Sequence, residues 1–93
     1  MIVGTLQIVI EIPCNNTLKG KRRVLKGLME RIRGRFNVSV SEVGNQDAHQ
    51  IATIGIACVG TDKGVVDSML QEVISFVEMH PEVVMLDYYL ELL

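Results

Sequence analysis

Basic side chains are concentrated in one short stretch of the chain. Positions 17 to 36 hold eight of the nine lysines and arginines and a single acid, Glu30, which gives this segment a net charge of +7. The other 73 residues hold one base and ten acids, so the overall charge of −2 conceals a strongly polarised chain. Clustered lysine and arginine side chains neutralise phosphates, and the segment is therefore a candidate for nucleic-acid binding.

The spacing of these bases predicts that most of them share one face of a helix. Asn16 or Thr17 can cap a helix that runs from about Leu18 to Phe36. At about 100° per residue, the apolar side chains of this segment fall in one arc of roughly 100°, and most bases fall in the opposite arc, together with Glu30. The candidate nucleic-acid-binding residues are Lys19, Lys21, Arg22, Arg23, Lys26 and Arg33.

Two features of this segment depart from a simple amphipathic helix. Lys21 projects into the apolar arc, so its ammonium either reaches solvent past the sheet edge or lines a cleft beside the first loop. Gly20, Gly27 and Gly34 recur every seven residues on one flank, although each interior glycine costs a helix about 1 kcal/mol relative to alanine. Such glycines either occupy exposed sites without a role or allow a partner's backbone to approach closely.

Residues for catalysis or metal binding do not form a recognisable pattern. The chain has no Gly-x-Gly-x-x-Gly after a strand, no Gly-Lys-Ser/Thr loop, no Cys-x-x-Cys and no His-Glu-x-x-His. His49 and His80 lack ligand-spaced partners. Glu42 and Asp47 could face each other across a hairpin and do acid–base chemistry or bind a cation; hydrogen bonds that stabilise the turn explain them equally well, and we prefer that interpretation. We expect no enzyme activity, no metal and no cofactor.

Hydrophobic patterns define the elements that must position these side chains. Alternation predicts strands over 2–12, 37–43, 51–59 and 83–92, and helical spacing predicts helices over 18–36 and 64–79. This β-α-β-β-α-β order predicts one α+β domain over 1–93. Its arrangement is expected to be ferredoxin-like, a four-stranded antiparallel sheet with both helices on one face.

The other face of the sheet is predicted to stay open. Strict alternation assigns to it Val3, Thr5, Gln7 and Val9 from the first strand and Val83, Met85 and Tyr89 from the last. This face is more apolar than a solvated face needs to be, which usually means a partner, and a homodimer is the simplest case. Thr53 or Gly55 stands where RNA-recognition motifs carry stacking aromatics, so any RNA binding should come from the helix.

The composition does not indicate a membrane or secreted protein. No apolar run approaches the ~18–20 residues needed to cross a bilayer, and the N-terminal residues do not form a secretory signal. We expect a cytoplasmic location, where Cys14 and Cys58 stay reduced.

Three stretches of the chain resemble a known family. Segments 17–24 (TLKGKRRV), 35–43 (RFNVSVSEV) and 46–50 (QDAHQ) are similar to the YlxP-like proteins, small bacterial proteins that carry a domain of unknown function. The resemblance covers nearly the whole chain and implies a ferredoxin-like fold, a cytoplasmic location and no established activity. Relatives often lie in gene neighbourhoods with translation and ribosome-maturation factors, which points toward RNA. Where His49 stands, an aromatic residue, usually Trp, is common in the family.

These observations leave three hypotheses for function. In the first, the chain is a non-catalytic binding protein that contacts RNA or the ribosome through the basic helix, although this face could instead be solvated and simply balance the acidic remainder. A pI near 5.6 and an aromatic content of 4% weigh against RNA. In the second, the chain is a homodimeric protein-interaction module with no nucleic-acid ligand. In the third, it is a regulatory domain that binds a small molecule at a dimer interface.

Overall fold

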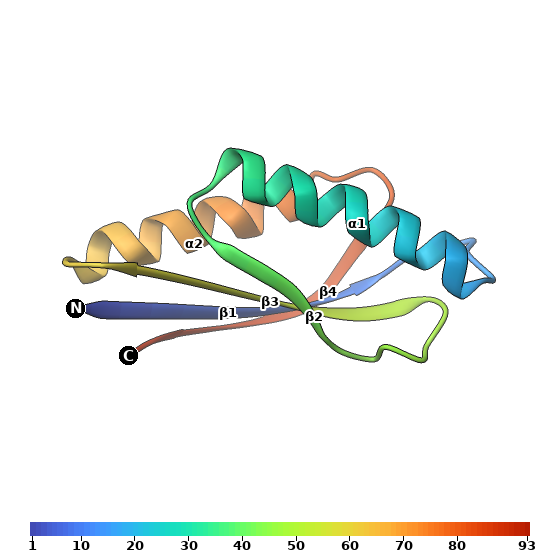
Figure 1. Cartoon of the computed structure of the whole chain (residues 1–93), viewed down its shortest axis with the longest axis horizontal. Helices are drawn as coiled ribbons and strands as arrows, with labels where there is room; N and C mark the ends of the chain where they lie inside the picture. The colour runs from blue at the N-terminus through green and yellow to red at the C-terminus, as the bar shows by residue number, and fades with distance from the viewer.

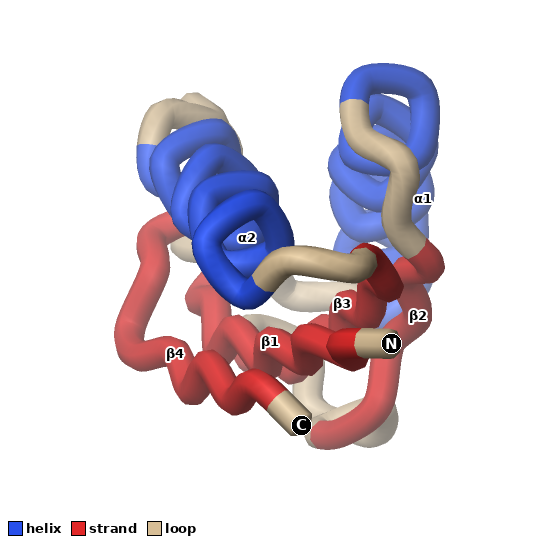
Figure 2. Tube along the Cα trace, turned by 90° about the vertical axis from the view of Figure 1, so that its left-hand side faces the viewer, coloured by secondary structure: helices blue, strands red, loops and turns tan.

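Four strands and two helices follow one another in the predicted order (Figure 1). The computed structural model describes residues 1–93. The elements are β1 (Ile2–Glu11), α1 (Leu18–Arg35), β2 (Ser39–Gly44), β3 (Ile51–Gly60), α2 (Lys63–Glu78) and β4 (Val84–Leu92). Every neighbouring pair of strands is antiparallel, in the spatial order β2-β3-β1-β4. Both helices cover the same face of this sheet, so the ferredoxin-like α+β fold is confirmed (Figure 2).

Alternation along the central strands produces the core between the sheet and the helices. Leu6, Ile8 and Ile10 of β1 point toward the helices and are at most 1% exposed. They pack in one cluster with the apolar stripes of both helices, which include Leu28 of α1 and Val73 of α2. Burial of such side chains stabilises the fold by about 1.5–3 kcal/mol each relative to exposure. Neither helix combines the length and the apolarity that a membrane crossing requires.

The last strand departs from strict alternation because it contains a β-bulge. Val9 of β1 pairs with Asp87, whereas Ile10 pairs with Met85, so Leu86 is an extra residue between the two pairs. An extra residue in one strand reverses the faces to which the residues before and after it point. The two halves of β4 therefore follow opposite patterns.

This bulge corrects the predicted composition of the open face. Val83 is 6% exposed and belongs to the core, and Met85 packs against that core from the helix side. The assignment of both residues to the open face was wrong. Val84 pairs with Glu11 of β1 and lies on the open face instead, together with Tyr89.

The two helices stand apart over the sheet. Helix α1 packs on β2, and helix α2 packs on β1, β3 and β4 (Figure 2). They are linked at one end by an edge-to-face contact between Phe36, which follows α1, and Phe76 of α2, with ring centroids 5.8 Å apart. Both helices thus present an outward face and a flank toward the other.

Candidate nucleic-acid interface

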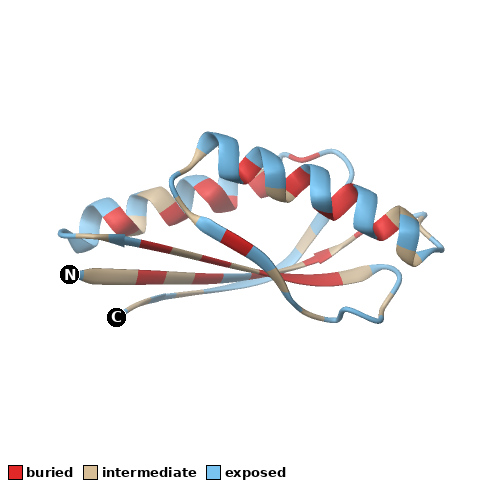
Figure 3. Ribbon diagram, in the orientation of Figure 1, coloured by how far each residue is buried: buried red, intermediate tan, exposed pale blue.

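Five of the six predicted nucleic-acid-binding residues form one exposed surface. We call this set the basic surface; its members are Lys19, Arg22, Arg23, Lys26 and Arg33. The outer side of α1 is exposed along its whole length (Figure 3). At 1.5 Å per residue, the basic surface extends over about 21 Å from its first to its last residue. Its role in binding stays a prediction.

Few of these charges are neutralised within the protein. One member of the basic surface, Arg23, forms an ion pair with Glu82. The nitrogen and oxygen are 4.0 Å apart, and both side chains are at least half exposed. Exposed pairs of this kind are worth between 0 and about 1 kcal/mol. Arg33 donates a hydrogen bond of 2.8 Å to the carbonyl oxygen of Val40 and so ties α1 to β2. Lys19, Arg22 and Lys26 have no acidic partner within 4 Å.

Lys21 does not belong to this surface, and its assignment to the binding residues was wrong. Its side chain is 1% exposed and neither reaches solvent nor lines an open cleft. The ammonium donates to the carbonyl oxygens of Asn45 at 2.6 Å and Ala48 at 2.8 Å, and lies 3.1 Å from Glu42 Oε2. A buried lysine needs such partners, because desolvating an unpaired charge is very costly. Lys21 therefore fastens the β2–β3 turn to the start of α1.

The carboxylate of Glu42 takes part in this attachment of the β2–β3 turn to α1, which we call the Lys21 clamp. Its Oε2 is buried and receives no well-directed hydrogen bond, so its attraction to the Lys21 ammonium is mainly electrostatic. Asp47 is exposed and is not paired with it. The preference for a turn-stabilising role over a catalytic carboxylate pair agrees with this geometry.

Side-chain hydrogen bonds hold the rest of the turn in place. Asn45 adopts a left-handed backbone with φ of 60°, which asparagine tolerates, and its amide donates to Thr53 Oγ1 at 3.1 Å. Asn15, ahead of α1, donates to the carbonyl oxygen of His49 at 2.7 Å. The His49 side chain is exposed. Hydrogen bonds from Asn15, Lys21 and Asn45 thus hold the β2–β3 turn in place.

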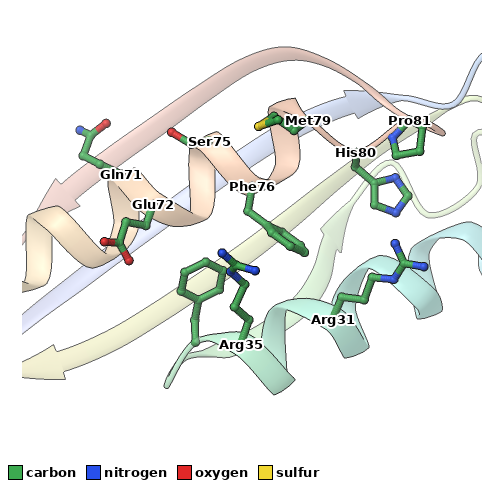
Figure 4. Close-up of a pocket in the computed structure, with 10 residues that line it drawn as sticks. Arg31, Arg35, Gln71, Glu72, Ser75, Phe76, Met79, His80 and Pro81 are labelled. Carbon is green, nitrogen blue, oxygen red and sulfur yellow. The ribbon is translucent and has the colours of Figure 1, made fainter.

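Two arginines that the sequence reasoning left out lie on the opposite flank of α1. Arg31 and Arg35 face α2 and line a cleft of about 720 Å³ between the helices (Figure 4). The Arg35 guanidinium carbon is 5.5 Å from the centre of the Phe76 ring and 5.9 Å from that of Phe36, which is cation–π geometry. Helical angles separate these arginines from the basic surface, but only the position of α2 shows that they border a cleft.

His80 closes one end of this cleft and is buried, at 8% exposure. Its Nδ1 accepts a hydrogen bond of 3.3 Å from the backbone N–H of Glu82, so the neutral ring carries its proton on Nε2. Burial lowers the pKa of His80, and the nearby Arg31 lowers it further, against the opposing effect of Glu82. The neutral ring is therefore the form present at pH 7.

The comparisons with known proteins agree with this picture of a small domain without an assigned activity. The model of a family described as "Protein of unknown function (DUF503)" matches residues 3–90. The chain belongs to this family. It is also 42% identical over 67 residues to "Uncharacterized protein YlxP" of Bacillus subtilis (strain 168), a match that covers 72% of this chain and 73% of that protein. The resemblance to YlxP-like proteins is confirmed.

The segments that carried the resemblance converge in this DUF503 protein on the Lys21 clamp. Lys21 lies in segment 17–24, Glu42 in segment 35–43, and Ala48 in segment 46–50. The motif thus describes how the β2–β3 turn is attached to α1. It does not by itself indicate a ligand site.

The open sheet face of the same protein offers a second, apolar surface. Val59 and Tyr89 are 66% and 63% exposed, and Val84 is 47% exposed. A shallow groove of about 330 Å³ runs over small central residues, including Gly55, which pairs with Gln7. The central strands β1 and β3 carry no aromatic side chain.

Proposed function

We propose that this protein binds RNA, ribosomal or otherwise structured, through the basic surface of α1 and that it catalyses no reaction. The proposal rests on five exposed bases on one side of a single helix. Among these five, Arg23 alone forms an ion pair, with Glu82 at 4.0 Å. Such a surface fits a polyanion with a phosphate backbone, such as RNA, because each phosphate contact releases a counterion and adds affinity. The proposal places the protein in the cytoplasm, where ribosomes are found.

The placement of the charges argues against a face that serves only solubility. Helix α1 has no acid in its first turn, where Lys19 lies close to the positive end of the helix dipole. A base there opposes the dipole by about 0.3–1 kcal/mol. The pairs Lys19–Arg23 and Arg22–Lys26 are spaced i, i+4, and like charges at that spacing cost about 0.2–0.5 kcal/mol each. A bound phosphate backbone would turn these costs into attraction.

The chemistry of this surface defines the kind of recognition expected. Lysine and arginine contacts to phosphates fix position and supply affinity, but they read no base sequence. Five such contacts to single-stranded RNA predict that the logarithm of the binding constant falls with the logarithm of salt concentration with a slope of about −3.5. Binding should therefore be strong at low salt and only weakly sequence-dependent.

A matched pair of charge reversals tests the proposal. Arg22→Glu and Lys63→Glu change the net charge equally and alter exposed residues, but only Arg22 lies on the basic surface, since Lys63 begins α2. We expect Arg22→Glu to weaken binding to ribosomal RNA at least tenfold in a filter-binding titration and Lys63→Glu to weaken it less than threefold. Equal losses would mean that only the overall charge matters and would contradict the proposal.

Self-association through the open sheet face is a second candidate function. Val59, Val84 and Tyr89 support it, because all three are exposed apolar side chains on this face, although the strand register spreads them along the length of the sheet. If this face forms a homodimer, Tyr89→Arg combined with Val59→Glu should yield a monomer in sedimentation equilibrium. A wild-type protein that is already monomeric at high concentration would exclude this candidate.

A further inference from the structure

We propose that the cleft between α1 and α2 holds one unpaired nucleotide of the RNA, with its base against the Phe36–Phe76 pair and the Arg35 guanidinium and its phosphate at Arg31. This inference rests on the proposed function and adds to it a second site, which distinguishes a base from bare backbone. The basic surface would hold the strand, and the cleft would recognise a nucleotide that is not in a duplex.

The cleft has the size and lining of a nucleotide site. Its volume of about 720 Å³ lies within the 300–1,000 Å³ of typical small-molecule pockets. Arg31 and Arg35 supply two cations from the α1 side (Figure 4). From the α2 side, Glu72 points toward α1 and offers a carboxylate as a hydrogen-bond acceptor, whereas Gln71 and Ser75 border the cleft but point away from α1 (Figure 4).

Aromatic surface is concentrated here and nowhere else on the helix layer. Phe36 and Phe76 are the two phenylalanines of the chain, and both line the cleft while remaining partly exposed. Their rings meet at 78°, and the Arg35 guanidinium lies within 6 Å of both. Aromatic rings and guanidinium groups are the platforms on which proteins stack unpaired bases.

An unused hydrogen-bond donor points into the same space. His80 is 8% exposed, and its Nδ1 accepts the hydrogen bond from the Glu82 N–H; its Nε2 forms no hydrogen bond within the protein and remains accessible to solvent. The ring projects toward the side of α1 that carries Arg31 (Figure 4). A carbonyl oxygen of a base or a phosphate oxygen would satisfy this donor.

Two glycines, Gly27 and Gly34, lie on the flank of α1 between the basic surface and the cleft. Their helical angles, at about 100° per residue, place them there. A Cβ atom added at either glycine would meet no other atom within 4 Å, so packing inside the protein does not require glycine at these positions. Their lack of a side chain leaves room for a sugar–phosphate backbone to pass from Lys26 toward Arg31.

The test compares two RNAs that differ only in their bases. A single-stranded oligonucleotide and the same oligonucleotide with abasic sites carry equal charge, and fluorescence anisotropy gives the affinity of the intact protein for each. We expect the wild type to prefer the base-bearing strand at least fivefold, since stacking of one base is worth that or more. Arg35→Gln and Phe76→Leu should remove the preference for the base-bearing strand. Arg22→Gln, which loses the same charge as Arg35→Gln, is the control: it should weaken binding to both strands and leave the preference unchanged.

The outcomes separate this inference from the proposed function. Equal wild-type affinity for both strands would overturn the nucleotide site and leave RNA binding by the basic surface intact. No binding to either strand would overturn both. Phe76→Leu retains most of the apolar volume, and a melting curve shows whether it folds; Arg35→Gln alters an exposed residue and tests the same point independently.

Discussion

The two helices lie on the same sheet and bury similar apolar stripes, but their outer faces are opposites. Helix α2 carries one base and three acids, and its N-cap, Asp62, accepts hydrogen bonds from the backbone N–H groups of Gly64 at 2.7 Å and Val65 at 3.4 Å. Helix α1 carries eight bases and one acid. Its cap, Thr17, accepts one such bond, from Gly20 at 3.0 Å.

This contrast separates what the fold needs from what it does not. An acid at the N-cap of α2 favours the helix both by hydrogen bonding and by the dipole. In α1, bases in the first turn and three glycines all lower helix stability, and packing inside the protein explains only part of them. The outer face of α1 is therefore the part of the molecule whose composition the fold itself does not explain.

The largest expected effect comes from reversing the charge of the basic surface. Arg22→Glu, Arg23→Glu and Lys26→Glu together should reduce affinity for RNA at least a hundredfold, because three attractive contacts become repulsive. The three side chains are exposed, so circular dichroism and melting temperature should show an intact fold. Binding that survives this change would locate the RNA site elsewhere and remove the functional contrast between the helices.

The next effect concerns Lys21, the buried base of α1. Lys21→Ala should lower the free energy of unfolding by about 3 kcal/mol, because Glu42 Oε2 and two backbone carbonyls lose their partner. Urea denaturation measures this loss. Lys19→Ala, two residues away and exposed, is the control and should change stability by less than about 0.5 kcal/mol. Similar values for the two variants would contradict the clamp.

The glycines on the flank of α1 sharpen the comparison further. Gly27→Ala and Gly34→Ala should each raise the free energy of unfolding by about 0.5–1 kcal/mol, since alanine is the better helix former and nothing obstructs its methyl group. If RNA passes along this flank, the same variants should bind it more weakly. Gly20→Ala should destabilise instead, because its Cβ would clash with Asn15 Oδ1.

The smallest effect is a pH dependence that involves His80. Its pKa is lowered in the folded protein, mainly by burial and also by Arg31, so the unfolded chain binds a proton more readily. The stability that neutral His80 contributes is fully present above its ordinary pKa of about 6.5 and is lost as the pH falls below that value. In thermal melts from pH 7.5 to 5, the melting temperature should decrease less for His80→Gln than for the wild type. Identical pH dependence of the two melting temperatures would contradict this role of His80.

The order of the elements was predictable from hydrophobic periodicity, and the ferredoxin-like sheet followed from that order together with the right-handedness of the crossover connections. Five of the six proposed binding residues are exposed because the helical period places them opposite the core. The faces of the sheet on which Val83 and Met85 lie were predicted wrongly, because alternation of apolar residues does not reveal a β-bulge. Lys21 was missed because its partners are two backbone carbonyls and a carboxylate at least 21 residues away.

The cleft was missed because it belongs to two helices at once. Arg31 and Arg35 differ from the basic surface only in helical angle, and Phe76 and His80 come from the other half of the chain. Phe36 falls in the apolar arc of the first helix, which predicts that it is part of the buried face. Only the separation of α1 from α2 leaves the space between them open.

Binding of the purified protein to ribosomal subunits and total cellular RNA across a salt series tests the central claim most directly. The account predicts saturable binding whose logarithm falls linearly with the logarithm of salt concentration, with a slope of about −3.5 for single strands. It also predicts a shallower slope for the triple charge reversal. Absence of binding at low salt would contradict the account, and it would make the basic surface of α1 a solvated face or a docking site for an acidic protein.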